Sequence, residues 1–216
     1  MMKATRTRAR RASFTLAAWV ASVGIYFGTP APSAAQTVTT GTLLVASPEL
    51  GDPNFARSVI LVLRHDDEGT IGVVLNRPTN LVPATIFPEL GASIGSYQGH
   101  LFRGGPIAAT RLLYIVRGLA AATVSGPEVL DKVFLSIDDE SLPDMVRLAD
   151  GTNDLRLYAG HAAWAPGQLQ MEINAGGWQL LPGSPELVFH TDPGGLWAEL
   201  EGRGANGVNV VAALGD

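Results

Sequence analysis

Short apolar runs separated by turn residues dominate the chain, a pattern typical of β-strands. Residues 58–65 are apolar on both faces until their last two positions, which predicts a central strand. Residues 66–69 are three acidic residues and a glycine, which favour a hairpin loop, so residues 70–76 are expected to form the returning strand. Further strands are predicted at 41–46, 111–117, 129–137, 154–160, 178–182 and 186–190.

Apolar residues at helical spacing are confined to shorter segments. Residues 82–90 predict a short helix that two prolines interrupt. Residues 142–149 predict a second helix, which follows an approximate capping box formed by Ser141 and Asp144. A last helix is predicted to open at 192 and to end at 202, because its apolar residues lie one turn apart and a glycine follows them.

The stretch 157–173 combines a predicted strand, a tight bend, a Trp and a helix start within fewer residues than any other part of the chain. We expect it to be the hub of the fold. Pro166 suits the first position of a helix, and Leu169 and Ile173 share one helical face. The structural motif predicted here consists of Trp164, Pro166, Gly167, Gln168, Leu169 and Glu172.

The first 35 residues have the three-part layout of a secretory signal peptide. A basic beginning precedes an apolar run at 14–27, and Ser33 and Ala35 place small residues before a cleavage site at Gln36. The apolar run is shorter than the about 20 residues that a membrane span needs. An uncleaved anchor and a mis-assigned start codon are the alternative interpretations.

The composition indicates one folded domain. A chain of 216 residues with 46% hydrophobic and 16% charged residues buries one substantial core. The predicted organisation is a signal peptide at 1–35 and a single domain at 36–216. That domain is expected to have its core at about 41–202 and a peripheral tail at 203–216.

The mature chain is expected to be strongly acidic. Five of the 15 basic residues and none of the 20 acidic residues lie within 1–35, so cleavage leaves a net charge of −10. Nucleic-acid binding rests first on neutralising phosphates, so an acidic domain without a Lys/Arg cluster is a poor candidate for it. Anionic membrane surfaces are disfavoured for the same reason. The absence of cysteine excludes disulfides and thiolate metal sites.

No catalytic signature is found in the sequence. The serines lack a Gly-x-Ser-x-Gly elbow, and there is no phosphate-binding or dinucleotide-binding loop. His161, Glu172 and His190 carry side chains that can bind zinc, but their spacing matches no short motif. We therefore predict no catalytic residue, no metal ion and no cofactor.

His65 is the first candidate for a ligand site. It ends a predicted strand beside the acidic loop residues, with Asn76 and Arg77 at the far end of the same hairpin. One interpretation is a general base or a metal ligand, and the other is a strand-end His that hydrogen-bonds to backbone.

A second candidate combines Arg77 and Arg103 with Gly104 and Gly105. Glycine lets backbone N–H groups approach a ligand, and Arg binds carboxylate or phosphate with two parallel donors, so these residues predict a small anion site. The alternative is that the glycines only turn the chain and that each arginine pairs with a nearby acid.

Four separated motifs resemble the YqgE/AlgH family over most of the mature chain, from about 41 to 202. They are LLVASP at 43–48 with FARSVI at 55–60, His65 before GVVLNRP at 72–78, GGP at 104–106, and WAPGQL at 164–169 with Glu172, Ile173 and Trp178. The resemblance implies a compact α/β fold of the α+β type, with a largely antiparallel, barrel-like sheet and helices against it. It brings no agreed catalytic residues, and it implies regulators or proteins of unassigned activity.

Our leading hypothesis is a non-enzymatic binding or regulatory protein of this type, periplasmic or secreted after cleavage. It is expected to act through a protein partner or a small anionic ligand, without nucleic acid and without stable membrane insertion. One alternative is a hydrolase-like or metal-dependent enzyme centred on His65 and Arg77. Another is a cytoplasmic transcriptional regulator, which the family label implies and which a mis-annotated N-terminus would allow.

Overall fold

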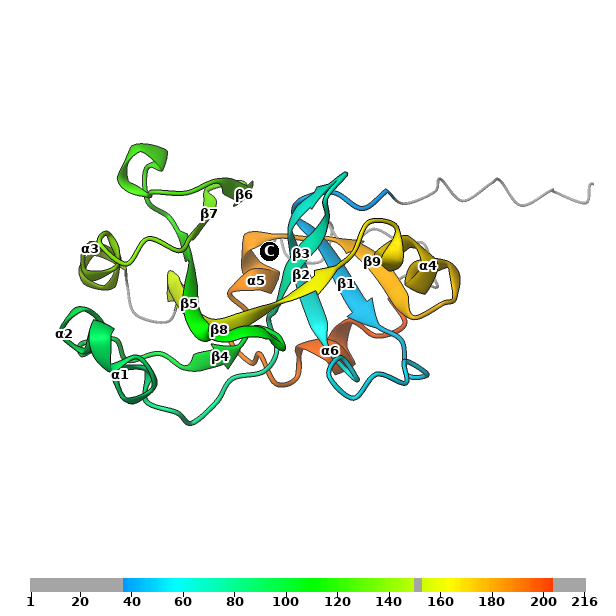
Figure 1. Cartoon of the computed structure of the whole chain (residues 1–216), viewed down its shortest axis with the longest axis horizontal. Helices are drawn as coiled ribbons and strands as arrows, with labels where there is room; N and C mark the ends of the chain where they lie inside the picture. The colour runs from blue at the N-terminus through cyan, green and yellow to red at the C-terminus, as the bar shows by residue number, and fades with distance from the viewer. Residues whose placement is uncertain (1–36, 150–152, 204–216) are drawn as a thin grey trace, which may run out of the picture. The chain divides into compact units, whose positions relative to one another are not determined.

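The computed structural model describes residues 37–149 and 153–203 (Figure 1). The predicted signal peptide and nearly all of the predicted tail lie outside these residues, and both stay predictions. The strands are β1 (Thr42–Ala46), β2 (Val59–Asp66), β3 (Gly69–Val74), β4 (Leu101–Arg103), β5 (Ile107–Arg117), β6 (Glu128–Leu130), β7 (Val133–Ser136), β8 (Leu155–Trp164) and β9 (Trp178–Pro182). The helices are α1 (Pro83–Ile86), η1 (Pro88–Leu90), α2 (Gly91–Ile94), η2 (Ala121–Thr123), α3 (Leu142–Leu148), α4 (Gln168–Asn174), α5 (Pro185–Val188) and α6 (Leu196–Leu200).

The described strands form one nine-stranded sheet in the order β6-β7-β5-β8-β3-β2-β1-β9, with β4 paired to β8. Every pairing is antiparallel except that of β4 with β8. The sheet curls into a half-barrel, and short helices pack against it (Figure 1). The predicted α+β fold with a largely antiparallel, barrel-like sheet is confirmed.

The predicted hairpin is also confirmed. Strands β2 and β3 pair from Ile60 opposite Val74 to Asp66 opposite Gly69. The loop works as its sequence indicated, because Gly69 has a positive φ of 127° and the Asp66 carboxylate accepts a hydrogen bond from the Glu68 backbone at 2.9 Å.

Strand β8 connects the two halves of the sheet. Its residues 155–159 pair with β4 and β5, whereas its residues 162–164 pair with β3. The predicted end of this strand at Gly160 is wrong. Gly160 adopts a φ of 71°, so the strand changes direction there and continues to Trp164. The stretch expected to be the hub therefore keeps its strand-to-helix corner, with the bend at 165–167 between β8 and α4, and only the strand runs further than predicted.

The strand predicted at 186–190 is instead helix α5. Ser184 caps this helix, because its hydroxyl oxygen accepts a hydrogen bond from the Leu187 backbone N–H at 3.3 Å. Pro185 then occupies the first helical position. These two start signals distinguish the helix from a strand, because a short apolar run fits both.

Two helices begin later than the sequence predicted. Helix α4 starts at Gln168, because Gly167 has a left-handed φ of 76° and separates Pro166 from the helix. Helix α6 starts at Leu196, because the Asp192 carboxylate accepts a hydrogen bond from the Gly195 backbone at 3.1 Å and holds a turn instead.

Residues 129–137, predicted as one strand, form the β6–β7 hairpin, which turns at Lys132 with a φ of 54°. The predicted capping box before α3 is absent from the structure, since the Ser141 hydroxyl hydrogen-bonds to the Tyr114 hydroxyl at 2.7 Å.

Apolar side chains fill both faces of the sheet. One face packs against α5 and α6, which contribute Val188 and Leu196 to a cluster with Leu61 and Tyr158. The opposite face near β5 packs against α1 to α3. Helix α4 lies beside β9 (Figure 1), and its Leu169 belongs to a buried cluster with Trp164 and Trp178. None of the helices in the described ranges has the length and apolarity of a membrane-spanning segment.

Candidate functional site

The residues predicted to form a ligand site do not converge on one place. His65 lies beside the β2–β3 loop, where its Nδ1 hydrogen-bonds to Thr70 Oγ1 at 2.7 Å. Asn76 lies at the other end of the hairpin, where its Oδ1 accepts a hydrogen bond from the Val59 backbone at 2.9 Å. Val59 and His65 are about 20 Å apart along an extended strand. A single site that contains both His65 and Arg77 is therefore not formed.

Asn76 and Arg77 hold the loop that precedes β2. The Asn76 amide also donates to the Arg57 carbonyl at 2.9 Å. The Arg77 guanidinium donates to the carbonyls of Asn54 and Ala56, at 3.2 Å in the second case. Burial lowers the pKa of Arg77, and the neighbouring positive charge of Arg103 lowers it further. These contacts account for both residues as supports of the fold.

Arg103 and the double glycine lie between strands. The Arg103 backbone donates to the Arg77 carbonyl at 2.9 Å, so the structure does bring these two arginines together. Gly104 donates to the Ala159 carbonyl at 2.9 Å and accepts from the Val74 backbone at 2.8 Å. A Cβ atom on Gly104 would lie 2.2 Å from the Gly160 carbonyl oxygen. Close backbone packing therefore explains Gly104 without a ligand.

Gly105 is equally enclosed. A Cβ atom there would lie 2.1 Å from the His161 carbonyl carbon and 2.4 Å from the Ala162 nitrogen. An anion site on the exposed guanidinium of Arg103 stays a prediction. The two glycines are explained by close backbone packing, and their backbone does not form a binding site for an anion.

The motif around Trp164 is a hydrogen-bonded network centred on Glu172. The Glu172 carboxylate accepts from the indole N–H of Trp164 at 3.0 Å and from that of Trp178 at 2.8 Å. Gln168 donates to the same carboxylate at 3.0 Å, and its own side-chain oxygen accepts from the Ala165 backbone at 3.1 Å. Leu169 is buried beside the two indoles. Hydrogen bonds of the predicted structural motif thus connect β8, α4 and β9.

The three side chains considered for zinc are separated. Glu172 is engaged with the indoles, and His190 Nε2 pairs with Glu199 at 2.9 Å. His161 lies on β8, where burial lowers the pKa of its imidazole. Within the described residues, no group of three or more His, Cys, Asp or Glu side chains is arranged to hold a metal ion.

Arg156 on β8 is the residue with the most unusual surroundings. Its exposed fraction is only 4%, and one of its terminal nitrogens, Nη2, donates to the His190 carbonyl. The guanidinium lies 4.9 Å from the ring centre of Phe102 and 5.6 Å from that of Phe189. The other terminal nitrogen, Nη1, is buried without a hydrogen-bond partner in the described part of the chain.

This guanidinium lines a cavity of about 270 Å³, which we call the arginine pocket. The pocket lies between β4, the start of β8 and the segment after α5. The walls comprise aromatic rings, imidazoles and small polar groups. Besides Arg156, Phe102 and Phe189, they include Gln98, His100, Asn153, His190, Thr191 and Pro193.

The nearby charges leave Arg156 uncompensated. Arg117 lies 4.7 Å from the Phe189 ring centre, but it is paired with Asp154 at 3.1 Å. Arg156 forms no ion pair with a carboxylate in the described ranges. A buried cation is costly unless a counter-charge or hydrogen bonds compensate it, so the pocket is suited to an anion.

Arg156 could not readily be selected from the sequence pattern. In the alternating run 154–160, an arginine between two leucines is expected on the solvent side. In the structure, that side of β8 is covered by the segment that carries Phe189 and His190.

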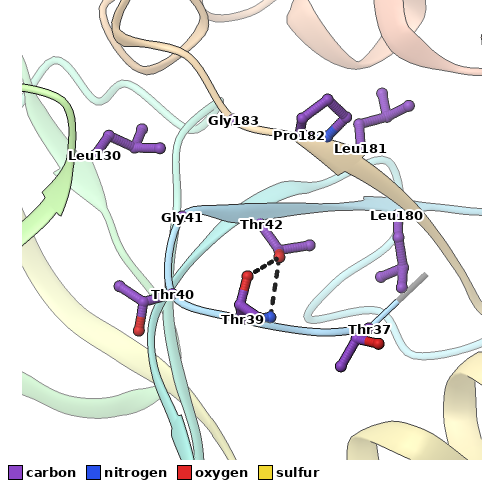
Figure 2. Close-up of a pocket in the computed structure, with 10 residues that line it drawn as sticks. All are labelled: Thr37, Thr39, Thr40, Gly41, Thr42, Leu130, Leu180, Leu181, Pro182 and Gly183. Carbon is purple, nitrogen blue, oxygen red and sulfur yellow. Dashed lines mark hydrogen bonds between the residues drawn. The ribbon is translucent and has the colours of Figure 1, made fainter.

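A second hollow of about 400 Å³ lies where β1 begins (Figure 2). Its wall is formed by threonines and leucines, and Thr39 hydrogen-bonds to the Thr42 hydroxyl through both its backbone nitrogen, at 3.1 Å, and its own hydroxyl. None of the described residues that line it is charged. It therefore offers less to orient a ligand than the arginine pocket.

Comparison with known proteins gives one consistent result. Residues 43–204 match the family profile described as AlgH-like. A UPF0301 protein of Streptomyces avermitilis is 38% identical over 181 residues, which cover 82% of this chain and 92% of the relative. A UPF0301 protein of Mycobacterium leprae is 35% identical over 171 residues, which cover 77% and 83%.

Two solved structures share the fold. A crystal structure of a Corynebacterium diphtheriae protein is 29% identical, with a TM-score of 0.64, and the match covers 76% of this chain and 86% of that one. The solution structure of AlgH from Pseudomonas aeruginosa is 27% identical, with a TM-score of 0.61, and the match covers 82% and 95%.

Proposed function

We propose that this chain, which belongs to the AlgH-like family as its sequence motifs predicted, is a non-enzymatic protein that binds a small anion in the arginine pocket. The proposal rests on the residues of this chain, because the family description mentions no ligand. The observation that carries this proposal is Arg156, which lines the cavity with an exposed fraction of only 4% and forms no ion pair with a carboxylate in the described ranges.

The chemistry of the pocket favours a carboxylate or a phosphate. An anion in the pocket places its negative charge beside the buried Arg156 guanidinium, and that interaction is strong in a partly desolvated site. The two aromatic rings hold the guanidinium in place, so little side-chain entropy is lost on binding. A volume of about 270 Å³ is near the lower end for ligand cavities and suits a small ligand.

An enzymatic role has less support from the same pocket. His190 uses Nε2 to pair with Glu199 at 2.9 Å and Nδ1 to contact the Asp192 backbone. Tyr158 is close to Arg156 but does not line the pocket, and burial raises its pKa to about 12, although the Arg156 cation acts in the opposite direction. The phenol therefore stays protonated at neutral pH and is a poor general base. Binding is the function that these contacts support best.

We expect the replacement of Arg156 by Met to weaken phosphate binding at least ten-fold. Hydrogen bonds to a charged group contribute about 1.5–3 kcal/mol, and about 1.4 kcal/mol corresponds to a factor of ten in affinity. The measurement is calorimetric titration with sodium phosphate in a buffer free of other multivalent anions. Met fills a similar volume, so the variant is expected to keep the wild-type circular dichroism spectrum.

The matched variant Arg103→Met tests the site that the sequence predicted. It removes an exposed arginine outside the pocket and is expected to leave phosphate affinity within two-fold of wild type, a tolerance of roughly 0.4 kcal/mol. Equal affinities of wild type and Arg156→Met would contradict the proposal. Loss of binding in Arg103→Met alone would move the site to the Arg77–Arg103 pair.

We also propose that the protein acts in the periplasm or outside the cell. The support is the basic and apolar layout of residues 1–35 and the small residues Ser33 and Ala35 before Gln36. Mass spectrometry of the N-terminus from fractionated cells is expected to find a chain that begins at Gln36 outside the cytoplasm. A cytoplasmic chain that retains residues 1–35 would contradict this.

A further inference from the structure

A third cavity, of about 300 Å³, lies on the sheet away from the arginine pocket. Its walls are mainly aliphatic and come from β2, β3, β5 and β7, including Leu63, Ile71, Leu113 and Leu135. Ile137, which lines the cavity, is an apolar residue with an exposed fraction of 65%. Ile107, next to the lining residue Ala108, is 47% exposed. We call this cavity the bulge cavity, because an irregularity of β5 forms one side of it.

The irregularity is built into both strands. Ile107 lies opposite His161 and Leu112 lies opposite Ala159, so four residues of β5 face the single residue Gly160. Ala108 has a φ of 50°, a conformation that non-glycine residues rarely adopt. A Cβ atom on Gly160 would lie 2.7 Å from the Ile107 carbonyl oxygen, so only glycine allows the bulge to approach.

The bulge places two polar side chains at an apolar cavity. Arg111 and His161 both line it, and Arg111 is exposed. Within the described ranges, the Arg111 guanidinium forms no ion pair or hydrogen bond. Glu89 and Asp139 line a neighbouring hollow together with Arg111, but neither reaches salt-bridge distance from it. Burial lowers the pKa of His161, so its imidazole is a neutral hydrogen-bonding group at neutral pH.

We propose that the bulge cavity binds a small amphipathic carboxylate, with its aliphatic body against the leucines and its carboxylate on Arg111 and His161. Ligand sites of this kind combine apolar walls with a few polar groups that fix orientation, and strained backbone often accompanies them. The charge complementarity is specific, because Arg111 is a cation without a counter-ion at the rim of an apolar cavity. The site is independent of Arg156 and of the anion proposed there.

Octanoate is a suitable probe, with octanol and acetate as partial analogues. The wild-type protein is expected to bind octanoate about ten-fold more tightly than octanol, because only octanoate uses Arg111, and to bind acetate too weakly to measure. Calorimetric titration gives the affinities, and backbone NMR shifts of residues 107–113 and 161 locate the ligand. Equal affinities for octanoate and octanol would overturn the role of Arg111.

Three variants and one competition experiment separate the remaining outcomes. Arg111→Met is expected to lower octanoate affinity about ten-fold, to the level of octanol, whereas Arg147→Met on the surface of α3 leaves it unchanged. Leu135→Trp fills the cavity and is expected to abolish the binding of both probes. Saturating phosphate is expected to leave octanoate binding intact. Displacement of octanoate by phosphate, or its unchanged binding to Leu135→Trp, would overturn the proposal.

Discussion

Replacing Gly104 by Ala is expected to destabilise the fold by about 3 kcal/mol or more, because there is no space for a side chain between β3 and β8. The added Cβ atom would lie 2.2 Å from the Gly160 carbonyl oxygen and 2.8 Å from a methyl group of Val73. The backbone oxygen cannot move without breaking the hydrogen bond from Gly104 to Ala159. Urea unfolding followed by tryptophan fluorescence measures the free energy of unfolding.

Gly51→Ala is the matched control, because a Cβ atom at Gly51 meets nothing within 4 Å. Its backbone is not left-handed, so alanine is expected to change stability by less than about 1 kcal/mol, in the stabilising direction. Equal effects of the two substitutions would contradict the packing explanation. The double glycine would then need another role, such as the anion site that the sequence predicted.

The parts of the fold that could be predicted are those with strong local sequence signals. The acidic loop at 66–69 marks a hairpin, and the apolar runs on either side fix its strands. The segment at 186–190 lacked such a signal, since a short apolar run fits a strand or a buried helix equally well. Only Ser184 and Pro185 distinguish the helix from the strand. Capping contributes less free energy than the burial of an apolar face, so these two residues are a weak signal in the sequence.

The candidate site was harder to predict, because it depends on contacts between distant parts of the chain. Arg156 becomes buried through a carbonyl 34 residues later in the sequence. Its aromatic neighbours, Phe102 and Phe189, also come from separate segments. Single-sequence patterns report which residues share a face, and they do not report which other segment will cover that face.

The residues that identify the family are largely engaged in holding the fold. Asn76 and Arg77 fix a loop, Gly104 packs between strands, and Glu172 joins two indoles. The side chains proposed to meet ligands, Arg156 and Arg111, stand outside the quoted motifs. Membership of the family therefore fixes the scaffold, whereas ligand specificity rests on positions that the motifs do not include.

Replacing Glu172 by Ala is expected to lower the free energy of unfolding by about 3 kcal/mol. The substitution leaves the indole N–H groups of Trp164 and Trp178 without their acceptor, and each lost hydrogen bond to a charged group costs about 1.5–3 kcal/mol, less than additively for a shared partner. The ring centres of Phe55 and Trp164 are 5.7 Å apart in a stacked arrangement. The packing of Phe55 is therefore expected to loosen together with the two indoles. Urea unfolding gives the stability, and the emission maximum of the folded variant reports the environment of the indoles.

Two further variants make this result specific to the network. Glu172→Gln keeps an acceptor oxygen without the charge and is expected to lose about half as much stability, roughly 1–2 kcal/mol. Glu49→Ala removes an exposed carboxylate and is expected to change stability by less than about 0.5 kcal/mol. If Glu172→Ala resembled Glu49→Ala in both stability and emission, the carboxylate would not hold β8 to β9. The motif around Trp164 would then be free to serve a ligand, which is the role that its hydrogen bonds now argue against.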